Sequence, residues 1–329
     1  MTPATPIFAG PLADGMERFL AHKRVLGRRY DTEAGALHLF DRYLVHERMT
    51  AVGDITPQVV EAFLLSRPRT RPRSFNHLRG VLSRLFAWLV VRGTVARSPV
   101  QTPTRRAGAS RLPCILTRDQ VRALLDAAAG LPDVPGSALR GPTYQAVFAV
   151  LYALGLRVGE VCRLTVSEVD RERRLLVVRN TKFGKDRLVP FGPRVAETLD
   201  HYTRLRRARD PHLTRDAALF ALRPGERLTR QGIGRVFRRL LPQVPLAIPV
   251  GASPPRVHDL RHSMAVGTLL RWYREGVDPA ARLLSLSTFL GHVQPESTAV
   301  YLTITAELLA EAGHRFEAFA HPLVTEVRR

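Results

Sequence analysis

Four separated segments of this chain hold polar residues whose types suit chemistry on a phosphate group. They are GLRVGE (155–160), NTKFGKD (180–186), RVHDLRHS (256–263) and FLGHVQPESTAVYL (289–302). Arginine can give two parallel hydrogen bonds to phosphate oxygens, and histidine can donate another. A tyrosine can attack phosphorus and form a covalent phosphotyrosine, which divides one transfer into two easier ones. Together, the four segments hold the groups that covalent phosphoryl transfer needs.

Each candidate side chain has its own task in this chemistry. Arg157 and Arg261 would bind the oxygens on which negative charge grows, and His292 would add a third donor. Tyr301 would be the nucleophile. Because a free phenol has a pKa of about 10, it needs a base, and His258 is the candidate.

The lysines of the second segment stand out because arginine fills almost every other basic position. The chain has 50 Lys and Arg, of which only Lys23, Lys182 and Lys185 are lysines. A departing sugar hydroxyl needs a proton, which a lysine can supply near neutral pH and an arginine cannot. We therefore expect one lysine of this segment to be a general acid.

The charge of the chain indicates a polyanionic partner. Its formal net charge is +21 and its pI is near 11.3, which favours nucleic acid first and an anionic membrane second. No acidic residue occurs between Glu61 and Asp119, whereas twelve arginines do. We expect phosphate contacts from four arginines of this interval. They are Arg69, Arg71, Arg73 and Arg79.

The cysteines and the apolar segments indicate the cellular compartment in which the protein acts. Cys114 and Cys162 lack the CxxC spacing of a metal site and are too few for a disulfide framework. The N-terminal residues do not resemble a secretory signal, and the apolar run 145–156 is too short to span a bilayer. We expect a cytoplasmic, nucleoid-associated protein.

Hydrophobic periodicity predicts a mostly α-helical protein with a small β-sheet. Four helices are expected in residues 1–96, one of them starting at the Thr56-Pro57 cap and one ending near Gly93. Residues 97–114 are rich in proline and read as a linker before a second domain, 115–329. There, helices are predicted at 117–129, 142–155, 158–165, 193–208, 228–241 and through most of the residues from 257 onward. The runs 174–180 and 187–191 predict a hairpin around the lysine segment.

In their order and spacing, the four segments resemble the motifs of the tyrosine recombinases, the phage-integrase family of site-specific DNA strand exchangers. The similar features are an arginine in GLR, a lysine in a β-turn before an RLVP strand, HDLRH, and LGH with a tyrosine nine residues beyond its histidine. The resemblance covers residues 112 to 305, and the helical first domain fits the family's core-binding domain. The matching positions are Arg157, Lys182, His258, Arg261, His292 and Tyr301, with Glu160 supporting Arg157.

The resemblance implies DNA cleavage that leaves a 3′-phosphotyrosyl link and a free 5′-hydroxyl. Lys182 would be the general acid, and Lys185 a neighbouring DNA contact. The link conserves bond energy, so no cofactor, neither ATP nor a metal ion, is required. The C-terminal segment 306–324 reads as an amphipathic helix, which would pack on its own domain or dock on a neighbouring protomer of a synaptic tetramer.

Alternatives remain open at this point. The interval from Arg261 to His292 is longer than the family's commonest form and resembles transposon-associated subgroups, some of which work as sets of recombinases. A DNA-binding accessory factor of the same fold, without catalysis, is a second reading. A third is a metal-dependent hydrolase that uses His258 and His262, although the chain has Asp259 where HExxH has glutamate, and a structural role is commoner for such a pair.

Overall fold

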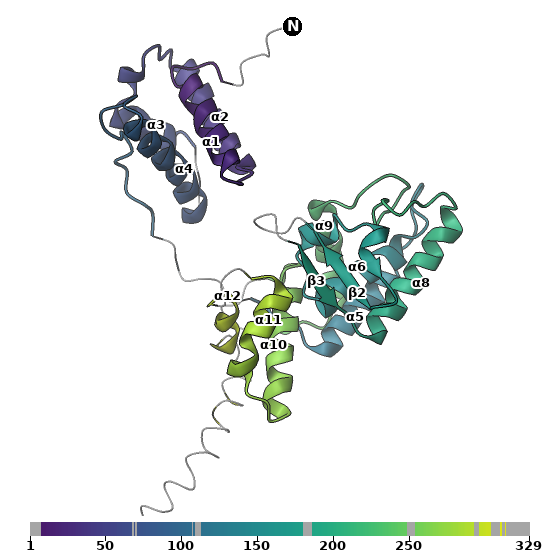
Figure 1. The fold of residues 1–329 in the computed structure, drawn as a ribbon. Helices are drawn as coiled ribbons and strands as arrows, with labels where there is room; N and C mark the ends of the chain where they lie inside the picture. The colour runs from purple at the N-terminus through teal and green to yellow at the C-terminus, as the bar shows by residue number, and fades with distance from the viewer. Residues whose placement is uncertain are drawn as a thin grey trace, which may run out of the picture. The chain divides into compact units, whose positions relative to one another are not determined.

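The computed structural model describes residues 8–67, 69, 71–106, 108, 113–179, 186–248, 254–292, 296–303, 310 and 313. The chain divides into two compact units, Met1–Ser110 and Arg111–Arg329 (Figure 1). The division falls inside the predicted linker 97–114.

The described residues of the first unit form four α-helices. They are α1 (Ala13–Val25), α2 (Asp31–His46), α3 (Pro57–Leu65) and α4 (Pro72–Val91), with a 3-10 turn at Val52–Asp54. Thr56 caps α3 by accepting a hydrogen bond from the Val59 N–H, and Pro57 takes the first helical position, as predicted. The apolar faces meet in a core with fully buried aromatic rings, among them Phe19, Phe40, Phe63 and Phe86. Burial of these faces holds together helices that would be marginal alone.

The first part of the linker packs on α4. The Asn76 side chain bonds both the N–H and the carbonyl of Arg105, at 2.8 Å each, and the Arg105 guanidinium lies over the Phe75 ring. Arg79 donates from Nε to the Thr102 carbonyl at 2.5 Å. Residues 102–105 therefore belong structurally to the first unit.

The second unit surrounds a small sheet with helices. Its first helices are α5 (Arg118–Ala129), α6 (Arg140–Ala153), α8 (Pro193–Arg209) and α9 (Arg230–Leu240). The antiparallel strands run in the order β1 (Val169–Asp170), β2 (Leu175–Val178) and β3 (Arg187–Pro190), and Leu176 lies opposite Val189. Figure 1 shows α5, α6 and α8 in the same part of the unit as β2 and β3. The predicted strands are present, and β1 adds one that the hairpin pattern did not indicate.

The helix predicted at 158–165 is wrong in its second half. Helix α7 covers only Val158–Val161, and a 3-10 turn follows at Val166–Glu168. The intervening backbone pairs elsewhere: the Leu164 carbonyl accepts from the Leu219 N–H at 2.8 Å, and the Val166 N–H donates to Ala217 at 3.1 Å. This extended pairing with 217–219 competes with helical hydrogen bonds and ends the helix.

The last third is helical, as predicted, as far as it is described. It contains α10 (Asp259–Arg274), α11 (Pro279–Leu290), α12 (Glu296–Ala299) and a 3-10 turn at Val300–Thr303. A separate apolar cluster joins these elements through Met264, Leu269, Leu286, Leu290 and Tyr301. The predicted C-terminal helix at 306–324 lies almost entirely outside the described residues. None of the described helices is long and apolar enough to cross a membrane.

Candidate active site

The position of Arg157 depends on the glycine that follows the end of α6. Gly155 has a φ of +56°, and a Cβ there would lie 2.3 Å from Met264 Cε and 2.8 Å from Leu290 Cδ2. Only glycine combines this left-handed backbone with such close packing. The buried Leu156 follows, and Arg157 then becomes the N-cap residue of α7 with its side chain 29 % exposed. The GLR motif thus places an anchored guanidinium at the surface of the unit.

Glu160 links two arginines. Its carboxylate accepts from the Arg157 guanidinium and from the Arg157 N–H, each at 2.9 Å, and it takes two further bonds from Arg187, also at 2.9 Å. Burial alone would raise the pKa of Glu160, but the hydrogen bonds and charge of Arg187, and then those of Arg157, lower it to about 2. Glu160 is therefore an anion that fixes both guanidinium groups, one on α7 and one on β3.

Arg261 joins the three helical segments of the site from a buried position. Only 1 % of the residue is exposed; one terminal nitrogen donates to the Gly155 carbonyl and the other to Leu290 at 2.7 Å. Burial, and then the charge of Arg157, lowers the pKa of Arg261 to about 10, so it stays charged at neutral pH. Arg157 also bonds to the end of α11, since it donates to the Gly291 carbonyl at 2.9 Å.

His292 is placed by the end of α11. Gly291 ends this helix with a φ of +67°, and a Cβ there would come within 2.8 Å of an Arg187 nitrogen. His292 follows, and its Nδ1 lies 2.6 Å from the Thr298 hydroxyl. This contact fixes the imidazole ring and leaves Nε2 as the nitrogen for another partner.

Tyr301 is buried in the described arrangement, with 3 % of the residue exposed. Its hydroxyl lies 2.9 Å from Nδ1 of His262, and its ring stacks at 6.3 Å from the ring of His292. Burial raises the pKa of Tyr301, and the charge of Arg261 opposes that rise. The phenol is therefore neutral at pH 7 before any substrate arrives.

The three histidines of the site stay neutral at pH 7. Burial, followed by nearby positive charge, lowers the pKa of His262 and of His292 to about 4. Partial desolvation of the ring, and then the neighbouring His262 and Arg261, lower the pKa of His258 as well. His258 is also exposed to solvent, which reduces that shift.

The fold brings most of the predicted site residues into one cluster. Arg157, Glu160, Arg261, His292 and Tyr301 are joined by the contacts above, and the His258 ring lies 4.7 Å from that of His262. Lys182 and Lys185 lie outside the described residues, in the segment between β2 and β3. Their assignments remain predictions.

The four arginines predicted to contact DNA have different surroundings. Arg71, the N-cap of α4, and Arg73 are exposed, while Arg69 and Arg79 are partly buried. The Nε of Arg79 already donates to the Thr102 carbonyl of the linker. Arg71 and Arg73 are consequently the two with the most accessible guanidinium groups.

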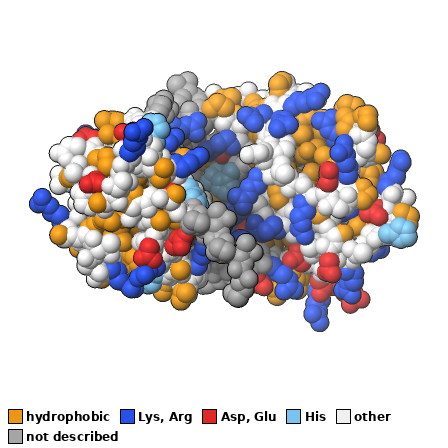
Figure 2. All heavy atoms as spheres, turned by 90° about the horizontal axis from the view of Figure 1, so that it is seen from above, with side chains coloured by type: hydrophobic (Ala, Val, Ile, Leu, Met, Phe, Trp, Pro, Cys, Tyr) orange, Lys and Arg blue, Asp and Glu red, His pale blue; other side chains and the backbone are white. Residues whose placement is uncertain are grey.

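Basic side chains are spread widely over the protein. In the face shown in Figure 2, Lys and Arg side chains recur across the surface, with fewer Asp and Glu among them. This is the surface expected from the net charge of +21. It favours contact with the phosphates of a nucleic acid.

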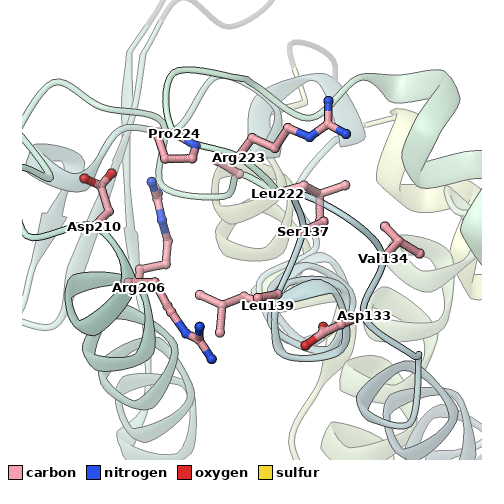
Figure 3. Close-up of a pocket in the computed structure, with 13 residues that line it drawn as sticks. Asp133, Val134, Ser137, Leu139, Arg206, Asp210, Leu222, Arg223 and Pro224 are labelled. Atoms are coloured by element: carbon pink, nitrogen blue, oxygen red, sulfur yellow. The ribbon is translucent and has the colours of Figure 1, made fainter.

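A separate pocket of about 270 Å³ lies away from these residues. Figure 3 shows it between the 133–139 loop, the end of α8 around Arg206 and Asp210, and residues 221–224. None of the candidate site residues lines it. The buried Arg206 guanidinium donates to the carbonyls of Ala218 and Leu219, so it holds a loop in place.

Three neighbours of the site were missed or misjudged from the sequence. The sequence pattern indicates only a zinc-ligand or a structural role for His262, and it indicates no role for Arg187 or Thr298. Arg187 opens the RLVP strand of the recognised motif, which was a usable signal; Thr298 had none. Among the described residues, no three His, Cys, Asp or Glu side chains gather at a spacing suited to a metal ion.

The sequence of the chain is similar to those of known integrases and recombinases. The family model of the phage integrase family matches residues 115–307. The chain is 35% identical over 309 residues to y4rE of Sinorhizobium fredii, a protein assigned as an integrase/recombinase, covering 94% of this chain and 96% of that one. It is 31% identical to tyrosine recombinase XerD of Mycobacterium leprae, with 93% of each chain covered.

Solved structures show the same fold. The integrase of the Tn1549 transposon, in complex with circular intermediate DNA, matches with a TM-score of 0.65 at 19% identity, over 94% of this chain and 100% of that chain. Lambda integrase (75–356), a dimer bound to a COC′ core site, matches with a TM-score of 0.61 at 19% identity, over 89% and 95% of the two chains.

Fold, motifs and relatives together define the class of protein as a site-specific DNA recombinase of the tyrosine type. The chain belongs to the phage integrase family.

Proposed function

We propose that this protein cuts and rejoins DNA strands at specific sites through a covalent link between Tyr301 and a 3′-phosphate. The observation that carries the proposal is one cluster of contacts. Arg157 and Arg261 donate to the carbonyls of residues 155, 290 and 291, directly before His292, and the Tyr301 ring stacks on the ring of His292. Two guanidinium groups and an imidazole can stabilise the charge that grows on a phosphodiester, and a phenol can attack its phosphorus.

The arginines would act on the phosphate. Negative charge grows on the non-bridging oxygens during attack, and preorganised cations stabilise it without reorganising at the moment of reaction. Glu160 and the carbonyls of residues 155, 290 and 291 hold both guanidinium groups in advance. His292, fixed by Thr298, would supply a further hydrogen bond.

Tyr301 would attack phosphorus through its phenolic oxygen, breaking the bond to the 5′-oxygen. Lys182 would protonate that oxygen as it leaves. The reverse attack, by a 5′-hydroxyl from another strand, would restore the diester and release the tyrosine. No net hydrolysis occurs, so the bond energy is kept throughout.

The wider role proposed is movement or resolution of a DNA element: integration, excision or transposition. The long interval between Arg261 and His292 supports a transposon-associated role, and the transposon and lambda integrases share the fold. Pairing of sites calls for several protomers. We therefore propose a synaptic tetramer on double-stranded DNA, assembled from this chain alone or with related recombinases, acting in the cytoplasm at the nucleoid.

The experiment is incubation with a suicide substrate, a duplex nicked near its cleavage point so that a short fragment diffuses away. The wild-type protein should form a DNA adduct that survives boiling in detergent. The Tyr301→Phe variant should bind the same DNA without forming one. Binding by the wild type with no adduct on its true site would instead indicate an accessory factor without catalysis.

A further inference from the structure

The hydroxyl of Tyr301 contacts a histidine that the motif comparison did not select. In the described part of the chain its ring-nitrogen partner is His262 Nδ1, at 2.9 Å, with the two rings 5.4 Å apart and steeply inclined. Nδ1 of His292 is engaged by Thr298 instead, and the ring of His258 lies edge-on to His262. Of the three histidines, His262 is the one placed to exchange a proton with the phenol.

The neighbouring charges determine the direction of that hydrogen bond. The positive charge of Arg261 acts on the Tyr301 oxygen, which favours a phenolic proton that points away from the guanidinium. The phenolic proton therefore needs an acceptor, which His262 Nδ1 provides when its proton is on Nε2. This tautomer is the one that a base beside the nucleophile must have.

We infer that His262, rather than His258, is the base that receives the Tyr301 proton. The inference rests on the proposed function. As the phenolic oxygen forms its bond to phosphorus, the proton passes to Nδ1 and the P–O5′ bond breaks, with the leaving oxygen protonated by the general acid. On rejoining, the imidazolium returns the proton to Tyr301. This leaves His258, at the solvent-exposed start of α10, for contact with a phosphate oxygen.

The surroundings of His262 suit a base that is neutral before attack. Arg256 and the N-cap residue His258 precede α10, and Arg261 lies on it. His292 and Tyr301 face it from the segments after α11. These positive and neutral groups disfavour a protonated imidazole in the free enzyme. Phosphate binding would add negative charge and make the proton easier to accept.

The test compares two amide variants in single-turnover cleavage of the suicide substrate. His262→Asn places an amide near the position of Nδ1, so it can hold Tyr301 but cannot take its proton. His262→Gln carries the amide toward the position of Nε2 and loses that contact. At pH 7 we expect about a 100-fold lower rate for Asn and roughly a further tenfold loss for Gln, with unchanged DNA affinity.

The pH profile separates a base from a structural residue. The wild-type rate should be nearly flat from about pH 6.5 to 8.5, whereas the His262→Asn rate should climb about tenfold per pH unit, because solvent must then ionise the phenol. His201→Asn, on the exposed face of α8, is the matched control and should behave as the wild type does. The inference would be overturned if the His262→Asn protein cleaved at the wild-type rate, or if it cleaved more slowly but with the pH profile of the wild type. A wild-type protein that forms no adduct would contradict the proposed function instead.

Discussion

Arg261 and Glu160 hold the candidate site together at the residue scale, and both are buried. Arg261 is bonded to carbonyls that lie two positions before two other motif residues, Arg157 and His292. Glu160 neutralises Arg157 and Arg187 from a position that is 3 % exposed. Each is a residue whose partners would be left as uncompensated buried charge or unpaired backbone if it were removed.

Glu160→Gln should destabilise the second unit and impair cleavage. Removing one member of a buried ionic group costs about 3–5 kcal/mol, because the remaining arginines lose their counter-charge. Urea unfolding measures the effect, with Glu197→Gln on the exposed face of α8 as the control, expected within about 0.5 kcal/mol. A Glu160→Gln protein as stable as that control would show that the carboxylate charge is dispensable.

The same carboxylate predicts the acid limit of stability. The pKa of Glu160 is about 2 in the folded protein against an ordinary value of 4.5. Its contribution is therefore complete above about pH 4.5 and is lost as the pH falls towards 2. Between pH 5 and pH 2, the free energy of unfolding should fall more steeply with decreasing pH for the wild type than for Glu160→Gln. An equal dependence on pH in the two proteins would contradict the low pKa of Glu160.

Lys182→Arg should keep DNA binding but lose most cleavage, because an arginine cannot donate a proton near neutral pH. General acid catalysis contributes about 10²–10⁴-fold, which sets the expected loss. A substrate with sulfur in place of the bridging 5′-oxygen has a leaving group that needs no proton and should restore the rate. Lys185→Arg is the matched control. An equal loss of cleavage rate on both substrates would show that Lys182 is not the general acid.

The resemblance of the four segments to the motifs of the tyrosine recombinases predicted which side chains would meet. Arg157, Arg261, His292 and Tyr301 do lie together in the structure. Partners that reach the site across the fold were beyond such reasoning. The contact of His262 with Tyr301 spans 39 positions of the chain, and Arg187 meets Glu160 from another element.

Two glycines position the site at the scale of elements. Gly155 ends α6 with positive φ where Met264 and Leu290 leave no room for a Cβ, and Gly291 does the same for α11 against Arg187. Both precede a candidate catalytic residue by one or two positions. The helix ends, rather than the helix bodies, thus set the direction of Arg157 and His292.

Gly155→Ala should destabilise the second unit by about 2 kcal/mol or more, since it adds left-handed strain to a steric clash. Gly234→Ala, within α9, is the matched control: nothing lies within 4 Å of its Cβ position, and the change should stabilise by up to about 1 kcal/mol. Thermal unfolding of both proteins measures the two changes in stability, which should have opposite signs. A neutral Gly155→Ala would mean that α6 can end in another way.

Element prediction succeeded where local signals and tertiary packing agree. The Thr56-Pro57 start of α3 is formed as predicted, and α5 begins one residue after the predicted start at 117. It failed at 158–165, where helical propensity was outweighed by backbone pairing with residues 217–219. The two-residue strand β1 is too short to leave a periodic pattern in the sequence.

For the whole molecule, the excess of positive charge has consequences for binding. Unit 1 carries exposed arginines at the start of α4, and unit 2 carries the candidate site. A protein that neutralises many phosphates releases counterions, so its DNA affinity depends steeply on salt. The net charge of +21 places this protein in that regime.

Raising salt from 50 to 200 mM should weaken DNA binding by about 10³-fold or more. The double variant Arg71→Gln/Arg73→Gln should reduce the slope of log affinity against log salt by about 2, one unit for each lost phosphate contact. Arg18→Gln is the control, because Arg18 is already paired with Asp14. Fluorescence anisotropy measures the DNA affinity of all three proteins at each salt concentration. An unchanged slope in the double variant would show that Arg71 and Arg73 do not contact DNA phosphates.

Identification of the amino acid that becomes linked to DNA tests the central claim most directly. The wild-type adduct, digested with trypsin, should yield a DNA-linked peptide spanning 283–315, in which Tyr301 is the single tyrosine. Fragmentation by mass spectrometry should place the 3′-phosphate on that tyrosine. A link on any other residue, or an adduct that persists in Tyr301→Phe, would contradict the account.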